Sequence, residues 1–166
     1  MADLPRMKPD PIPAIHPVPE FAVSGPRAAV YERTKKGLGV PWMGVVAMAF
    51  AHYPRFYDTL WSAMEPMTGT KAFAKTCQSL RDVAERESEA LGPAPMVSRL
   101  STRGYGAQEI DEIRACNEVF SSGNMPYVLM ATLARHLLEG NSWRGGGDLG
   151  RITTPQSNFP KPFLME

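Results

Sequence analysis

The chain has few cysteines and no excess of charge of either sign. Its two cysteines, Cys77 and Cys116, lie far apart, so they cannot form the disulfide framework of a small secreted protein. They fit a reducing compartment, where cysteine usually serves as a small core hydrophobe. Lysine and arginine total 18 against 17 acidic residues. This balance argues against a nucleic-acid-binding protein, because such proteins concentrate positive charge.

Long apolar segments are also absent. The longest stretch without a formal charge covers residues 37–54, and its strongly apolar part, residues 40–51, has the length of a buried helix rather than a membrane span. The first residues show neither the basic stretch nor the apolar core of a targeting segment. These features predict a soluble, cytoplasmic protein, and 166 residues that are 43% hydrophobic suffice for one domain with a core.

The prolines divide the chain into three parts. Seven of the 16 prolines fall in residues 1–26, where they fix φ and remove amide donors, so an extended arm is expected there. Its apolar side chains, including Ile15 and Phe21, leave two interpretations open: a loose tail, or a strap across a neighbouring subunit. Residues 27–140 are expected to form one helical unit, and residues 141–166 a tail rich in glycine and proline.

Within the central part, apolar residues recur at helical spacing and no segment alternates as a strand does. Pro26, Pro41 and Pro54 each stand where the first turn of a helix tolerates proline. Gly123 and Asn124 are expected to break the chain between the last two helices. The sequence therefore predicts an all-α fold of about six to seven helices. The expected helices cover residues 27–38, 41–52, 54–65, 69–91, 96–102, 108–122 and 126–138.

Familiar catalytic and cofactor motifs find little support. Residues 145–150 formally match a dinucleotide fingerprint, but that motif needs a strand-to-helix turn and no strand is expected there, so they are interpreted as a linker. The histidines His16, His52 and His136 are scattered, which gives no metal site. A nucleophile elbow and a Cys-x-x-Cys pair are also missing.

Less conventional candidates lie around Trp42 and the uncharged polar segment 121–127. The indole of Trp42 can form a wall of a small pocket, and the amide of Asn124 can hydrogen-bond a carboxylate or a water without adding charge. The residues alone favour a structural cap for Asn124 and core positions for Trp42 and Tyr127.

At these residues the chain resembles the group I 2-haloacid dehalogenases, all-helical enzymes that act on both enantiomers of 2-halocarboxylic acids. The resemblance runs from about Ala29 to Leu138 and rests on the order and spacing of several elements. These are Leu38-Gly-Val-Pro-Trp42, Tyr53-Pro-Arg-Phe-Tyr57 with Trp61 after it, Leu91-Gly-Pro-Ala-Pro95, Glu109-Ile-Asp-Glu-Ile113 and Phe120-Ser-Ser-Gly-Asn-Met-Pro-Tyr127.

The resemblance implies a particular assembly. Familiar members carry two related helical repeats in one chain, with the active site between them, whereas this sequence holds one repeat. A homodimer about a true two-fold axis is the expected consequence, with residues 40–51 and 126–138 in its interface and the proline-rich arm able to reach across it. Whether the 166 residues are a whole natural chain or half of a longer one stays open.

The resemblance also implies a reaction without metal or organic cofactor. Water, activated by an aspartate, attacks C2 of a small carboxylic acid and expels halide directly. The asparagine that helps hold this water corresponds to Asn124, and the pocket tryptophan to Trp42. Pocket positions fall at Val45, the aspartate position falls at Val46, and Tyr127 of the matched segment is a further substrate-binding candidate.

Valine at position 46 departs from this pattern, because it cannot accept a proton. One interpretation relocates the base, with Glu118, Asp58 and Glu65 as the nearest carboxylates, although each resembles a solvated helix charge. A second gives the pocket another reaction, isomerase-like or cyclase-like, on an apolar substrate. A third makes the protein a binding module for a small carboxylic acid without turnover.

Overall fold

The computed structural model describes residues 14–141 together with 150 and 151. These residues form one short 3-10 helix and six α-helices, and the described part contains no strand, only an isolated bridge between Thr70 and Arg151. The all-α prediction is confirmed. The elements are η1 (Glu20–Ala22), α1 (Gly25–Leu38), α2 (Val45–Phe50), α3 (Pro54–Met64), α4 (Lys71–Ala90), α5 (Met96–Thr102) and α6 (Ala107–Leu138).

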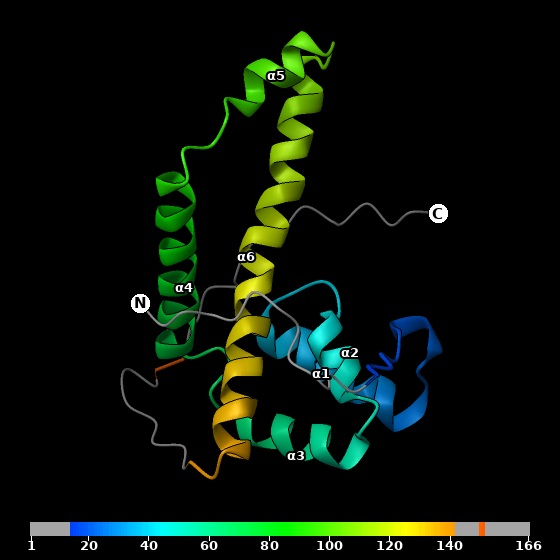
Figure 1. The fold of residues 1–166 in the computed structure, drawn as a ribbon. Coiled ribbons are helices and arrows are strands. Elements are labelled where there is room, and N and C mark those ends of the chain that lie inside the picture. Colours follow the sequence, from blue (N-terminus) through cyan, green and yellow to red (C-terminus); the bar gives the residue numbers. More distant parts are fainter. Residues whose placement is uncertain (1–13, 142–149, 152–166) are drawn as a thin grey trace.

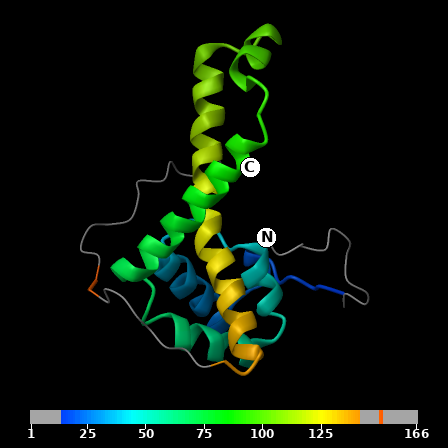
Figure 2. The ribbon, with the colours of Figure 1, turned by 60° about the vertical axis from the view of Figure 1, so that its left-hand side comes forward.

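The helices divide into a body and a projecting arm. In the body, α1, α2 and α3 surround the C-terminal half of α6, whereas α4 crosses α6 and both helices continue away from the body toward α5 (Figures 1 and 2). The hydrophobic core lies in the body. Its buried members are Tyr31, Leu38, Val40, Met43, Ala47, Ala51, Tyr57, Leu60, Trp61, Met64, Phe73, Tyr127, Met130 and Ala134.

Local sequence explains several helix ends. Pro26 stands in the first turn of α1, where its missing amide donor costs little, and Gly39 follows the last turn with a left-handed φ of 69°. The hydroxyl of Thr70 caps α4 by accepting a hydrogen bond from the Phe73 amide at 3.2 Å. These signals place α1, α3, α4 and α5 close to the predicted ranges.

Helix α2 is shorter than predicted, because it begins at Val45 and not at Pro41. Gly44 is its extended N-cap, with φ −69° and ψ 147°, so Pro41 and Trp42 remain in the preceding loop. If α2 began at Pro41, Trp42 would be a residue of the first turn of that helix. In the loop, its indole instead packs against α6.

The predicted break at Gly123 and Asn124 is wrong, because α6 runs unbroken through both and holds Pro126 in its interior. Proline removes one intrahelical hydrogen bond and normally kinks or ends a helix. Packing outweighs that cost here, since the buried positions continue at helical spacing across the expected break. In this half of α6 they are Val119, Gly123, Pro126, Tyr127, Met130 and Ala134.

The described part of the proline-rich N-terminal segment, from residue 14 on, contacts its own chain. The Val18 amide donates to the Met48 carbonyl at 3.0 Å, and the Tyr31 hydroxyl donates to the Val18 carbonyl at 2.6 Å. The side chain of Val18 packs on the core, whereas Ile15 and Phe21 are exposed. Residues 1–13, the candidate linker up to residue 149 and the tail after residue 151 lie outside the described residues.

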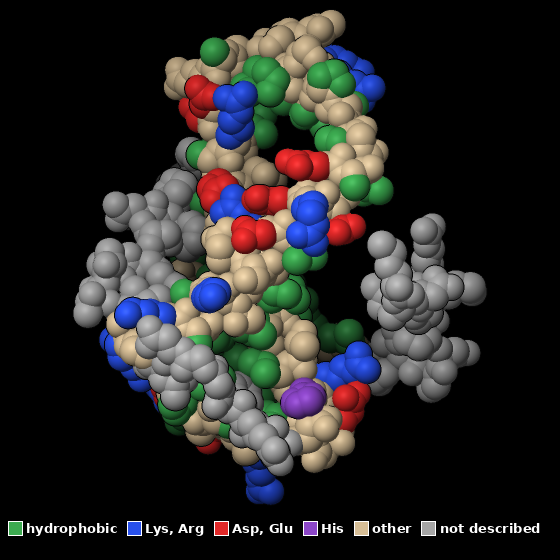
Figure 3. All heavy atoms as spheres, turned by 90° about the vertical axis from the view of Figure 1, so that its left-hand side faces the viewer, with side chains coloured by type: hydrophobic (Ala, Val, Ile, Leu, Met, Phe, Trp, Pro, Cys, Tyr) green, Lys and Arg blue, Asp and Glu red, His purple; other side chains and the backbone are tan. Residues whose placement is uncertain are grey.

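Acidic and basic side chains are mixed on the face that α4 presents (Figure 3). Arg81 on this helix pairs with Glu85 one turn later at 2.7 Å, as expected for a solvated helix face. Cys77 packs against the core as predicted, but Cys116 is exposed. None of the described helices combines the length and apolar character that a membrane crossing needs. Among the described residues, no cluster of three or more His, Cys, Asp or Glu side chains could hold a metal ion.

Candidate functional site

Trp42 lies directly on the backbone of α6 at Gly123. A Cβ atom added at Gly123 would be 2.3 Å from Cη2 of the indole, so any side chain there would displace the ring. The indole also contacts the ring of Phe120, with centroids 5.4 Å apart. The loop before α2 is thereby held against the middle of α6, one residue from Asn124.

Tyr127 fixes the same junction from inside the core. Its ring covers Gly44, where an added Cβ would be 2.7 Å from the ring carbons, and its hydroxyl donates to the Trp42 carbonyl at 2.5 Å. Burial raises the pKa of Tyr127 above its usual value of 10, so the hydroxyl stays a protonated donor at neutral pH. In this chain Tyr127 therefore positions the start of α2. Its hydroxyl proton is already donated to the Trp42 carbonyl.

Glu20 holds the loop from its other side. Its carboxylate accepts a hydrogen bond from the Met43 amide at 2.6 Å and pairs with the ammonium of Lys35 at 2.9 Å. The loop between α1 and α2 is thus tied to η1, to α1 and to α6. Such fixation is what a pocket wall needs, because a wall residue can contribute to binding only if it keeps its place.

The remaining predicted site residues lie toward the surface. Val45 is 65% exposed at the start of α2, and Val46 is half-buried. Asn124 is exposed on α6 between Phe120 and Val128, which are 51% and 47% exposed. These three residues of α6 follow one another at intervals of four and so share one stripe of the helix.

The structure therefore brings Trp42, Tyr127 and the start of α2 together beside Asn124. Sequence reasoning missed Gly44 and Gly123, which make room for the rings of Tyr127 and Trp42. The available signal for Gly123 is its place between Phe120 and Tyr127, which are aromatic residues at helical spacing. Local propensity instead predicts a helix break at this glycine. Phe120 begins one of the elements that carry the resemblance, but the sequence does not predict its contact with Trp42.

Comparison with known proteins shows which proteins the chain resembles as a whole. No family model matches the chain. It is 46% identical over its whole length to an (R)-2-haloacid dehalogenase of Rhizobium sp. (strain NHG3), covering 65% of that protein. It is 31% identical, over 92% of its length, to an (R)-2-haloacid dehalogenase of Pseudomonas putida, covering 52% of that protein. A solved complex of a D-2-haloacid dehalogenase mutant with D-2-CPA superposes with a TM-score of 0.75 at 31% identity, over 81% of this chain and 47% of that one.

The chain is a homologue of the 2-haloacid dehalogenases. It spans less than two thirds of either relative and about half of the solved structure. Both of these relatives are named for the (R) enantiomer. The group I subtype suggested by the sequence motifs is not confirmed.

For this dehalogenase homologue, two of the three carboxylates considered in place of a residue-46 aspartate, Glu118 and Glu65, are poorly suited as bases. Both Glu118 oxygens accept hydrogen bonds from Arg81, at 2.6 and 2.7 Å, and this holds the pKa of Glu118 below its usual value. Glu65 is paired with Arg33 in the same way, which lowers its pKa as well. A carboxylate with a lowered pKa is a weaker base, so neither pair favours proton abstraction from water.

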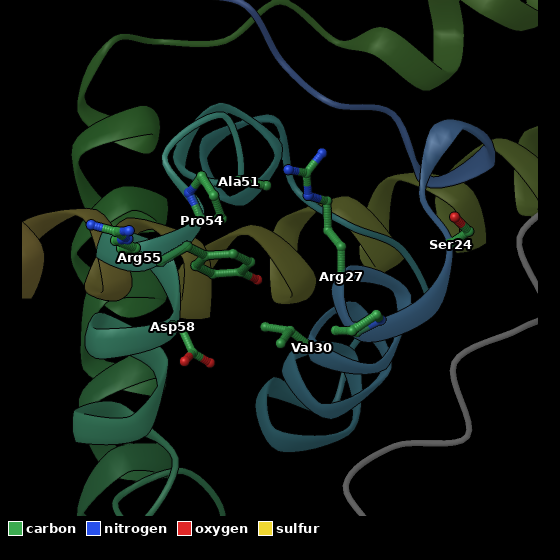
Figure 4. A pocket seen from close by; sticks show the side chains of 9 residues that line it. Ser24, Arg27, Val30, Ala51, Pro54, Arg55 and Asp58 are labelled. Carbon is green, nitrogen blue, oxygen red and sulfur yellow. The ribbon is translucent and has the colours of Figure 1, made fainter.

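Two cavities lie elsewhere in the dehalogenase-like fold. One, of about 500 Å³, is formed by α1, the end of α2 and α3, and includes Asp58 in its lining (Figure 4). The other, of about 220 Å³, lies between α4 and α6 and is lined in part by Cys77, whose pKa burial raises to about 11. Neither is lined by Trp42, Val45 or Asn124.

Proposed function

We propose that the protein catalyses the hydrolytic dehalogenation of a short (R)-2-halocarboxylic acid. Water attacks C2 from the side opposite the halogen, the carbon–halogen bond breaks, and halide leaves with the bonding electron pair. The water loses a proton to a base, and the product is the 2-hydroxy acid of inverted configuration. The names of the relatives, one of them 46% identical over the whole chain, support both the reaction and the enantiomer.

The proposed site lies between two copies of the chain. In a single copy, Phe120 and Val128 expose apolar side chains one turn before and one turn after Asn124 on α6, and Val45 exposes another at the start of α2. A second copy packed on this surface would remove the apolar side chains from water and enclose the amide, which is the environment that a displacement at C2 needs. The need for a second unit also agrees with the greater length of the relatives.

Each site residue has a distinct role in this proposal. The amide of Asn124 orients the attacking water or the substrate carboxylate, because it can donate and accept hydrogen bonds without carrying charge. The indole of Trp42 forms one wall, and Val45 and Val46 form another. The close packing of the Trp42 indole on Gly123 supports this role, since the indole cannot move without losing its contact with α6.

Halide release tests the proposal. Purified protein is incubated with (R)-2-chloropropionate and, separately, with the (S) enantiomer, and chloride is measured. We expect release from the (R) acid, and a loss of about tenfold or more in Asn124→Ala, because a positioned hydrogen bond in a reaction site contributes that much or more. Asn117→Ala removes an exposed amide two turns earlier on α6 and is the matched control. Absence of chloride from every short 2-haloacid would rule the reaction out.

Val46 supports a second candidate, a protein that binds a small carboxylic acid without dehalogenating it or that acts on another substrate. A valine at the position of the expected aspartate leaves the water without its base. In that case (R)-2-chloropropionate binds and no chloride appears. Calorimetric titration with the acid, run beside the chloride assay, separates this candidate from an inactive preparation.

A further inference from the structure

The larger cavity is separate from the dehalogenase-like site. It lies where the N-terminal turns of α1 and α3 approach the end of α2 (Figure 4). Its volume of about 500 Å³ is within the range of small-molecule pockets, which extends from about 300 to about 1,000 Å³. The residues proposed for dehalogenation do not line it.

One guanidinium group extends into this cavity. Arg27 reaches from α1 into the space facing Ala51, whereas Arg55, in the first turn of α3, belongs to the lining but directs its side chain away from Arg27 (Figure 4). Within the part of the chain that the structure describes, neither arginine makes a side-chain hydrogen bond or ion pair. Among the described residues of the lining, Asp58 is the one acidic side chain beside two arginines, so the formal charge of these residues is positive. Guanidinium groups without partners bind carboxylates strongly, because two parallel N–H donors match the two oxygens.

The ends of two helices add to this positive charge. The N-caps of α1 and α3, Ser24 and Tyr53, make no side-chain capping hydrogen bond, and neither first turn contains an acidic residue. The positive end of each helix dipole is thus left uncompensated by side chains of its own helix. Both ends adjoin the cavity, since Ser24 and Pro54 line it.

The rest of the lining selects the ligand class. Val30, Ala51 and Pro54 supply apolar surface, which favours a ligand with a hydrocarbon body. Asp58 would repel a second negative charge, which disfavours phosphate monoesters and dicarboxylates. We propose that this cavity is a second binding site, and that it takes an organic monocarboxylate with its carboxylate on Arg27 and its apolar part against Val30 and Ala51.

Benzoate is the probe, and benzamide is its neutral counterpart of the same shape. Calorimetric titration of the full chain should show benzoate binding and at least about tenfold weaker binding of benzamide, as expected when a charge-assisted hydrogen bond is lost. Arg27→Ala should weaken benzoate binding by about tenfold, and Arg55→Ala by less. Asp58→Asn should strengthen it, because a repulsive charge is removed. Arg99→Ala is the control, because Arg99 lies on α5, at the end of the projecting helices α4 and α6 that is far from the body (Figure 1). It should leave benzoate binding unchanged.

Amide shifts in nitrogen-15 spectra locate the bound probe. Benzoate should shift the signals of Arg27, Val30 and Asp58 and leave those of Gly123 and Asn124 in place. Arg27→Ala should also leave any chloride release from 2-chloropropionate unchanged, since Arg27 has no part in that site. Equal binding of benzoate and benzamide, an unaffected Arg27→Ala variant, or shifts confined to Gly123 and Asn124 would each overturn the proposal.

Discussion

The indole of Trp42 occupies the space where residue 123 would carry its side chain. Glycine inside a helix costs about 0.5–1 kcal/mol relative to alanine, so α6 carries a destabilising residue at its centre. The close contact offsets this cost, because it buries the indole face against the helix and keeps Trp42 beside Asn124. One small residue thus couples the folding of α6 to the geometry of the candidate site.

This coupling predicts that the effect of Gly123→Ala depends on the residue at position 42. In the wild-type chain the added methyl displaces the indole, and we expect a loss of about 1–3 kcal/mol in the free energy of unfolding. In a Trp42→Ala background the space is empty, so the same substitution should stabilise the chain by up to about 1 kcal/mol. Urea unfolding of the four variants measures both values in one double-mutant cycle. The same sign in both backgrounds would contradict the contact.

A second prediction concerns stability at alkaline pH. Burial raises the pKa of Tyr57 and of Tyr127 above their usual value of 10. Below pH 10 these tyrosines are protonated in both the folded and the unfolded chain, so their contribution to the free energy of unfolding is fully present. Above pH 10 the unfolded chain loses tyrosine protons that the folded chain retains. Stability should therefore fall as the pH rises beyond 10, by about 1.4 kcal/mol per pH unit for each such tyrosine.

Urea unfolding between pH 9 and 11 (values chosen around the usual tyrosine pKa of about 10) measures this slope. Tyr127→Phe should flatten it, at the cost of the hydrogen bond to the Trp42 carbonyl, about 0.5–1.5 kcal/mol at neutral pH. Tyr105→Phe removes an exposed tyrosine near the start of α6 and provides the comparison. An unchanged slope in Tyr127→Phe would mean that this hydroxyl is not buried in solution.

The helical class and most helix ranges could be predicted because they rest on local signals. Pro26 and Pro54 mark first turns, and Gly39 and Thr70 mark an end and a beginning. The start of α2 could not be predicted, since it depends on contacts between residues distant in sequence, such as Tyr127 with Gly44.

The region around Asn124 shows the same limit. Gly123, Asn124 and Pro126 are helix-breaking residues by local propensity, yet α6 continues because its buried face packs on the body on both sides of them. The resemblance to 2-haloacid dehalogenases located Trp42 and Asn124 by motif alone. That the indole of Trp42 packs on Gly123, the residue before Asn124, is a property of the packed structure.

A third prediction tests Glu118 as a base. Its pairing with Arg81 lies on the surface, so Glu118→Gln should cost less than about 1 kcal/mol in stability. If dehalogenation is the activity, its rate should stay within about twofold of the wild type, because the pair lowers the pKa of Glu118 and removes it as a proton acceptor. The measurement is chloride release by Glu118→Gln and by the wild type. A fall of about a hundredfold with an intact fold would identify Glu118 as the base.

A fourth prediction addresses the proposed pairing of two copies. Val128 is 47% exposed on the α6 stripe that contains Asn124, so Val128→Asp would place a charge inside the interface. Light scattering after size exclusion should show a dimer for the wild type and a monomer for this variant. Val83→Asp introduces the same charge at a 46% exposed valine on α4 and should remain dimeric. A wild-type monomer at micromolar concentration would refute the pairing.

The last prediction concerns the base that position 46 lacks. Val46 lies in the first turn of α2 and is half-buried, so an aspartate there would be directed by the same loop that Tyr127 and Gly123 hold in place. We expect Val46→Asp to raise the rate of chloride release from (R)-2-chloropropionate by about a hundredfold, the usual contribution of a positioned general base. Val46→Asn has nearly the same shape and no proton acceptor of comparable strength, so it should show no such gain. Equal rates for the two variants would mean that water activation does not depend on this position, and the base would then have to be sought on another element.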